Sequence, residues 1–213
     1  MKKNILILLL SLFFCACNQT DERKHTTEKK SETVTPSAQT NVFTKREKLI
    51  GEIKTLMQAM AEKDKPAILA YFNFPLADSS VNFFGVDPIF DAARKANNDR
   101  ITKAMFDNSF ASIYQKTEMS EFKNLIKFLK INNLENQDSV NYDNIIKGDG
   151  CYYFYSISVD HHDEVTLTYG TNSNDEYRKS HPDEEEICSE YAVAWIFKFD
   201  GKALHFLKHR IAG

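Results

Sequence analysis

The spacing of apolar residues changes along this chain, from a helical period to a strict alternation. Residues Leu49, Ile50 and Ile53 open a run of apolar positions at helical spacing that continues to Met60. Beyond about Val140 every second residue is apolar, as in half-buried strands. Helices followed by an antiparallel sheet indicate an α+β fold.

Helix-capping signals divide the first part of the chain into several helices. The sequence Thr44-Lys45-Arg46-Glu47 has the form of a capping box, so we expect the first helix to begin at Thr44. Further helices are predicted from Asp64, with Pro66 in the first turn; from Asp87-Pro88 to about Ala96; from Ile101 to Tyr114; and after a cap at Ser120.

The last forty or so residues carry a hairpin signal. Tyr191 to Phe199 alternate up to Asp200-Gly201, and the return strand runs from Ala203 to Ile211. A two-residue turn would pair Trp195 with Phe206. The inner face would then end in Tyr191, Lys208 and Arg210. The outer face would carry Ala192, Ala194, Ile196, His205, Leu207 and His209.

The N-terminus has the pattern of a secretory leader, with two lysines, a short apolar run from Ile5 to Phe14, and a small residue before a cysteine. The stretch Phe14 to Cys17 resembles a bacterial lipoprotein box. We therefore expect residues 1–16 to be removed as a signal peptide and Cys17 to receive diacylglycerol and an amide-linked chain such as palmitate. The alternative is an ordinary cleavage region without lipid.

The residues after Cys17 are almost all polar, so 17–42 are expected to form a flexible tether and 43–213 the folded domain. Asp21 and Glu22 resemble the acidic surface-export tag of some Bacteroidetes lipoproteins. The expected location is the cell envelope, with the lipid in a membrane, most simply the outer one, and the domain facing the periplasm or the surface.

Composition limits the choice of function and partner. Without Lys2 and Lys3, 25 basic residues face 30 acidic ones, a net charge of −5, which argues against a nucleic-acid partner. Cys151 and Cys188 lie at the starts of predicted strands in an exported protein. They either form a disulfide, which we favour, or remain two buried thiols.

Four segments carry a family resemblance: Phe74-Pro75-Leu76, the run from Ile101 to Phe106, the run from Trp195 to Gly201, and the terminal Ile211-Ala212-Gly213. They resemble uncharacterised bacterial lipoproteins that are similar in outline to the nuclear transport factor 2-like (cystatin-like) roll. The resemblance implies a curved sheet wrapped around a long helix. Its relatives include isomerases, cyclases and non-catalytic binding modules, so it implies no particular activity.

The candidate site of the predicted roll is formed by Tyr191, Lys208 and Arg210, which could bind an anionic group. In the alternative reading the two cations simply reach solvent. The clusters His161 to Glu164 and His181 to Glu186 have no recognised ligand spacing, so we expect no metal and no cofactor. The stretch from Asp175 to Glu190 is predicted to be a mobile acidic loop.

Three functions are compatible with these patterns. The first is a non-catalytic, lipid-anchored protein that binds a small ligand or an envelope protein. The second is an isomerase- or hydratase-type enzyme, which an inward carboxylate beside a tyrosine would favour. The third is an inhibitor or immunity-type protein that docks through its acidic loop. The outer sheet face could also form a homodimer that His205 and His209 make pH-sensitive. The alternative, which we favour, is that both are ordinary half-exposed histidines.

Overall fold

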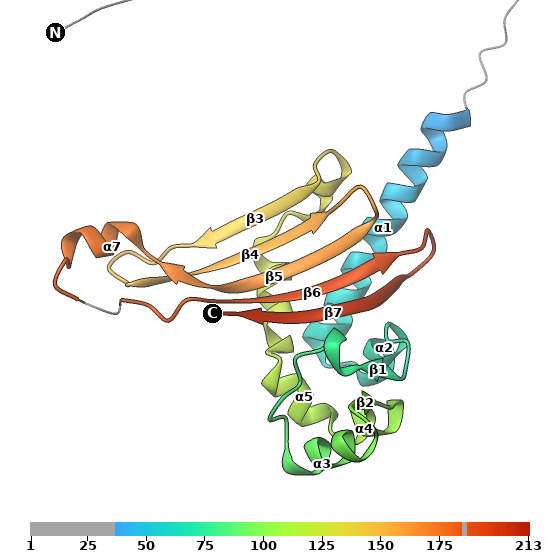
Figure 1. Ribbon diagram of the computed structural model, residues 1–213. Helices are drawn as coiled ribbons and strands as arrows, with labels where there is room; N and C mark the ends of the chain where they lie inside the picture. The colour runs from blue at the N-terminus through green and yellow to red at the C-terminus, as the bar shows by residue number, and fades with distance from the viewer. Residues whose placement is uncertain (1–36, 185–186) are drawn as a thin grey trace, which may run out of the picture. The chain divides into compact units, whose positions relative to one another are not determined.

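The computed structural model describes residues 37–184 and 187–213, and it shows an α+β fold (Figure 1). In this part of the chain there are seven α-helices, a five-stranded antiparallel sheet and a two-stranded ribbon. The helices are α1 (Ser37–Glu62), α2 (Lys65–Ala70), α3 (Pro88–Ala96), α4 (Lys103–Asn108), α5 (Phe110–Lys116), α6 (Phe122–Phe128) and α7 (Asp175–Ser180). The ribbon joins β1 (Leu76–Ala77) to β2 (Arg100–Ile101).

The sheet is a simple meander in which each strand pairs with the next along the chain. Its strands are β3 (Ser139–Asn144), β4 (Cys151–Val159), β5 (Glu164–Ser173), β6 (Tyr191–Phe199) and β7 (Leu204–Ala212). Alternate residues of the central strands, such as Leu167 and Trp195, are fully buried beneath the helices. Helix α6 packs against β4 and α1 contacts β7, so the core lies between one sheet face and the helices.

Helix α1 begins earlier than its capping box predicts. Its first residue is Ser37, which places Thr44 and Glu47 in the helix interior. A cap contributes about 1 kcal/mol, and a helix already nucleated by packing continues through residues that contain no Gly or Pro. Residues 37–42, expected in the tether, therefore belong to α1. The predicted leader, Cys17 and the rest of the tether lie outside the described residues.

Two of the predicted helix starts are confirmed by their caps. The Asp64 carboxylate accepts a hydrogen bond from the Ala67 N–H at 3.1 Å, and the Asp87 carboxylate accepts one from the Phe90 N–H at 2.7 Å. Each acidic cap is followed by a proline in the first turn, as the sequence suggests.

Two other helix predictions are wrong in detail. The single helix expected from Ile101 to Tyr114 is divided at Ser109 into α4 and α5. Ser120 does not cap α6, because a 3-10 turn, η2 (Met119–Glu121), precedes that helix. Two further 3-10 turns, η1 (Asp78–Ser80) and η3 (Ile131–Glu135), also connect elements.

The hairpin of β6 and β7 differs from the predicted register in two ways. Phe199 pairs with Leu204, because the Asp200 carboxylate accepts the N–H groups of both Lys202 and Ala203 and so holds a four-residue turn. A bulge at Leu207 then inserts an extra residue in β7. A bulge exchanges the faces of all residues beyond it.

The predicted disulfide is present. Cys151 at the start of β4 is bonded to Cys188, with the two Cα atoms 5.2 Å apart. The bridge closes a segment that we expected to be a mobile acidic loop but that contains the short helix α7. Asn174 caps this helix by accepting the N–H groups of Glu176 and Tyr177. Residues 175–180 of the predicted loop are therefore helical.

A buried arginine in α3 and a glycine in β5 each allow neighbouring segments to pack closely. Arg94 of α3 is buried and forms ion pairs with Asp78 of η1 and with Asp99. In the sheet, a Cβ added to Gly170 would lie 2.0 Å from the carbonyl oxygen of Tyr191, so β5 and β6 approach each other here only because residue 170 lacks a side chain.

Candidate functional site

The structure does not bring together the three residues predicted to bind an anion. Tyr191 lies on β6, whose faces are not exchanged by the extra residue in β7. It faces the helices, where its hydroxyl donates a hydrogen bond to Glu118. Lys208 and Arg210 lie beyond the bulge, paired with Ile196 and Ala194, and both are exposed. They therefore occupy the opposite face of the sheet from Tyr191, and the register that grouped the three residues is wrong.

The same bulge separates the two histidines that were expected to share the outer face. His205 stays outside, where its Nε2 lies 3.0 Å from Asp200 Oδ2. His209 instead turns inward and is 3% exposed, with its ring 4.4 Å from that of Trp195. Neither ring nitrogen of His209 has a hydrogen-bond partner, and burial lowers its pKa from 6.5 to about 4.

A group of tyrosines and glutamates on the inner side of the sheet is the strongest candidate site. We call the group formed by Tyr153, Tyr155, Tyr191, Glu118 and Glu121 the tyrosine–glutamate face. The three tyrosines come from β4 and β6, whose inward positions alternate with outward ones. The two glutamates come from the connection between α5 and α6.

Backbone geometry directs both glutamates toward the sheet. Glu118 has the left-handed conformation, with φ of 52° and ψ of 35°, and it begins the 3-10 turn η2. The N–H of Glu121 donates to the carbonyl of Glu118 at 2.9 Å. Residues three apart lie on the same side of such a turn, so both carboxylates face the same tyrosines.

Tyr169 anchors this turn to the sheet. Its buried hydroxyl lies 2.7 Å from the carbonyl oxygen of Thr117 and 3.1 Å from that of Glu118. The same hydroxyl accepts a hydrogen bond from Trp195 Nε1 at 3.3 Å. The position of Glu118 is therefore fixed by strands β5 and β6 and not by the helices alone.

Each glutamate accepts a hydrogen bond from one tyrosine. The Tyr191 hydroxyl lies 3.0 Å from Glu118 Oε2, and the Tyr155 hydroxyl lies 3.3 Å from Glu121 Oε2. Asn124 also donates to Glu121 Oε2, at 2.8 Å. Because burial disfavours a phenolate, and because the carboxylates add negative charge, the pKa of both tyrosines is raised well above 10. These phenols therefore remain neutral donors.

The face is open to solvent at one side. Tyr153 is 43% exposed, although its phenol is close enough to Tyr155 and Tyr191 to contribute to their raised pKa values. On β3, Tyr142 pairs with Tyr155; it is 40% exposed and stacks on Phe128 of α6, with ring centroids 4.8 Å apart. Large aromatic side chains left accessible beside polar groups are typical of binding surfaces.

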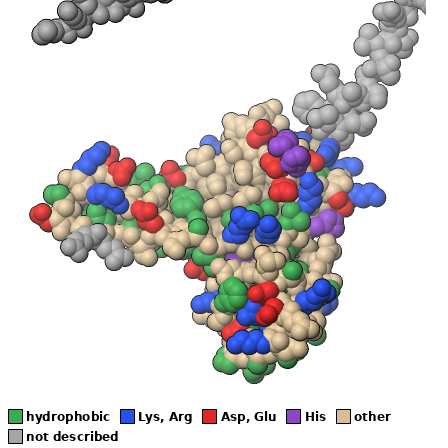
Figure 2. Space-filling view, viewed as in Figure 1, with side chains coloured by type: hydrophobic (Ala, Val, Ile, Leu, Met, Phe, Trp, Pro, Cys, Tyr) green, Lys and Arg blue, Asp and Glu red, His purple; other side chains and the backbone are tan. Residues whose placement is uncertain are grey.

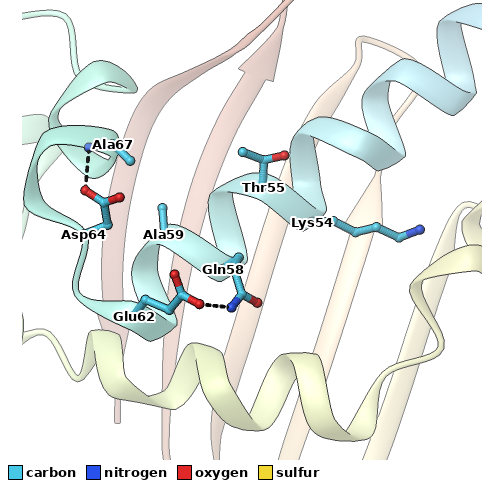
Figure 3. A pocket seen from close by; sticks show the side chains of 7 residues that line it. All are labelled: Lys54, Thr55, Gln58, Ala59, Glu62, Asp64 and Ala67. Carbon is cyan, nitrogen blue, oxygen red and sulfur yellow. Dashed lines mark hydrogen bonds between the residues drawn. The ribbon is translucent and has the colours of Figure 1, made fainter.

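A separate, open groove runs along α1, and its lining side chains are drawn in Figure 3. Its volume is about 450 Å³. It is lined by Lys54, Thr55, Gln58, Ala59, Glu62, Asp64 and Ala67. The polar groups drawn there bond one another, since Gln58 donates to Glu62 and the Asp64 carboxylate caps α2. With its polar groups occupied in this way, the groove offers little to recognise a ligand.

A second open groove, of about 490 Å³, lies between α7 and the loop that joins β3 to β4. Ile145 in that loop is 61% exposed, and Tyr177 and His181 of the α7 segment stack with ring centroids 3.9 Å apart. This groove adds an apolar rim near the disulfide, but among its described lining residues no buried side-chain polar atom lacks a hydrogen-bond partner.

The histidine clusters do not form a metal site. Histidine, acidic and basic side chains gather at one end of the sheet, where the β4–β5 and β6–β7 turns lie (Figure 2). Here Lys45 pairs with Asp163 at 2.8 Å, and the rings of His161 and His162 contact each other. Within residues 37–184 and 187–213, no three His, Cys, Asp or Glu side chains are arranged to hold a metal ion.

Sequence reasoning missed both glutamates of the candidate site. The inward positions of β4 and β6 carry tyrosines and apolar residues and no Asp or Glu. Glu118 and Glu121 lie between two helices, so only the tertiary fold brings them to the sheet. The alternation of Tyr153 and Tyr155 along β4 was the signal that could have directed attention to this side of the sheet.

No protein-family model, curated protein or solved structure matches this chain. Of the helices that the structure describes, none combines the length and the apolar composition needed to cross a bilayer.

Proposed function

We propose that this chain is a lipid-anchored protein of the cell envelope whose α+β domain binds a ligand without converting it. The observation that carries the proposal is the tyrosine–glutamate face, where an exposed tyrosine adjoins two hydrogen-bonded tyrosine–carboxylate pairs. Its groups are held by strands and by a turn anchored through Tyr169, so the face is formed before any ligand arrives.

The envelope location rests on the leader and on the disulfide. The basic and apolar residues before Cys17 support export and lipidation of that cysteine. The bond between Cys151 and Cys188 fits an oxidising compartment outside the cytoplasm. We further propose that the domain is a roll of the nuclear transport factor 2-like type, which the packing of one sheet face on the long α1 supports.

Binding is favoured over catalysis by the roles of the tyrosine hydroxyls. An isomerase of the type expected from the fold needs a free carboxylate base and a tyrosine that donates to the substrate oxyanion. Here Tyr191 and Tyr155 already donate to Glu118 and Glu121. The adjacency of carboxylate and tyrosine keeps the enzyme as the second candidate, and turnover of a bound ligand by wild type but not by Glu121→Gln would establish it.

Two surfaces remain as proposed partner sites. The outer face of the sheet, with half-exposed Ala194 and Ile196, is the proposed contact for a second copy of the chain. Because His209 is buried on the other face, it does not contribute to such a contact. The acidic residues after α7 are the proposed contact for an envelope enzyme under the inhibitor hypothesis.

The experiment uses the full, lipidated chain extracted from its host in mild detergent. The protein is incubated with a water-soluble extract of the host envelope, and the retained small molecules are identified by mass spectrometry. We expect wild type to retain a ligand that Tyr153→Ala loses. Tyr152→Ala is the matched control, because Tyr152 is the adjacent strand residue and points to the other face.

The double variant Lys208→Ala/Arg210→Ala tests the site that the sequence suggested. We expect it to retain the same ligand as wild type, since both side chains lie on the opposite face. Loss of the ligand in this double variant together with its retention by Tyr153→Ala would show that the site is misplaced. Failure of wild type to retain any small molecule would contradict the proposed function itself.

A further inference from the structure

The two carboxylates of the tyrosine–glutamate face have no basic partner. Glu118 and Glu121 are both half-buried, and neither takes part in the ion pairs found among the described residues. The nearest lysines in sequence, Lys116 and Lys123, are exposed. Two like charges that share a partly desolvated site repel each other, so a cation bound between them is favoured.

The surroundings of the two glutamates are aromatic. Tyr153, Tyr155 and Tyr191 lie around the carboxylates, and burial raises the pKa of Tyr155 and of Tyr191, so that both phenols remain neutral. The faces of neutral tyrosine rings attract organic cations. A hydrated metal ion would instead need several oxygen ligands in a regular geometry, and two carboxylates already bonded to tyrosines do not supply them.

Building on the proposed function, we propose that the ligand of the tyrosine–glutamate face is a small organic cation that carries an alkylammonium or guanidinium group. The charged end lies between Glu118 and Glu121, and its alkyl part contacts the exposed ring of Tyr153. Such a ligand supplies one positive charge beside two carboxylates that have no basic partner among the described residues, and it replaces water over an apolar ring.

The test is calorimetric titration of the full lipidated protein in detergent with choline and with n-propylguanidinium. The matched ligand control is 3,3-dimethylbutan-1-ol, which has the shape of choline without its charge. We expect at least one of the two cations to bind and the neutral alcohol to bind about tenfold or more weakly, because one charge-assisted contact is lost.

Variants locate the charge effect. Glu118→Gln and Glu121→Gln each keep an oxygen that can accept the tyrosine hydrogen bond, and each should weaken cation binding about tenfold to a hundredfold. Glu135→Gln, at an exposed residue of η3, removes the same charge elsewhere and should leave binding unchanged. Binding should also weaken as salt is raised.

The outcomes separate this inference from the proposed function. Binding of the neutral alcohol as tightly as choline would overturn the assignment of a cation while leaving a ligand site in place. Absence of binding by both cations would also overturn it, even if the envelope extract yields a ligand lost in Tyr153→Ala. Equal weakening by Glu135→Gln would show a general charge effect and would likewise refute the site.

Discussion

His209 is expected to make the stability of the folded domain depend on pH. The side chain is almost fully buried against Trp195 and Phe83, and its ring nitrogens have no hydrogen-bond partner. Burial lowers its pKa from 6.5 to about 4, so the folded protein keeps it neutral while the unfolded chain protonates it near pH 6.5. Its contribution to stability is therefore complete above pH 6.5 and is lost as the pH falls toward 4.

The size of the effect follows from the difference between the two pKa values. A separation of about 2.5 units corresponds to about 3 kcal/mol, at 1.36 kcal/mol per unit. Urea unfolding followed through the fluorescence of Trp195, the single tryptophan, measures the free energy between pH 7.5 and 4.5. Carboxylates with lowered pKa values, such as Asp200, add to the loss only toward the acid end of this window, where carboxylates of the unfolded chain begin to be protonated.

The matched variant is His209→Phe, which keeps a ring against Trp195 and cannot be protonated. We expect it to be at least as stable as wild type at pH 7, because it removes two unpaired polar atoms from the core. Its unfolding free energy should also change little between pH 6.5 and 4.5. If wild type and the variant lose stability in parallel over this range, the assignment of the pH dependence to His209 is wrong.

Four further changes test the fold. Gly170→Ala should destabilise the domain by about 2 to 3 kcal/mol, because its Cβ would overlap a β6 carbonyl, whereas Gly51→Ala, in an exposed and uncrowded part of α1, should stabilise it by about 0.5 kcal/mol. Arg94→Met should cost about 2 kcal/mol by leaving its acidic partners unpaired, and a cost that persists at high salt separates this buried pair from a surface one. Replacing Cys151 and Cys188 by Ser should lower the unfolding free energy by about 4 kcal/mol, because the unfolded chain gains conformational entropy when the cross-link is absent. A midpoint of urea unfolding equal to that of wild type would contradict this.

The sequence predicts the local elements of this protein well where a single short-range interaction decides them. The acidic caps at Asp64 and Asp87 each precede a proline, and both helices begin there. The alternation along β4 and β6 likewise gives strands of the expected extent. Capping is less decisive at Thr44, because residues 37–43 contain neither Gly nor Pro and an established helix continues through them.

The arrangement of side chains at the sheet end depends on features that local patterns do not encode. The Asp200-Gly201 pair does form the turn, but the Asp200 side chain closes a longer turn than the pair alone suggests. No residue type near Leu207, such as a glycine, signals the bulge in the sequence. The bulge nevertheless determines that His209 faces inward while Lys208 and Arg210 face outward. The predicted anion-binding site is therefore wrong, because its two cations and Tyr191 lie on opposite faces of the sheet.

The candidate site shows the same limit from the other direction. Its tyrosines are visible in the strand pattern, whereas its carboxylates reach the sheet through a turn between two helices. That turn is fixed by hydrogen bonds from Tyr169 to carbonyl groups that are remote in sequence. A contact between segments so far apart follows from the tertiary fold and not from the spacing of residues.

The most direct test of the binding face is NMR of the folded protein with carbon-13 in the rings of its nine tyrosines. Choline is titrated into this sample, and each ring signal is assigned by single Tyr→Phe variants. We predict saturable shifts of Tyr153, Tyr155 and Tyr191, whereas Tyr71, which packs against Phe197 toward the other end of β6, should be unchanged. Saturable shifts confined to Tyr177, or no shifts at any tyrosine, would contradict the account.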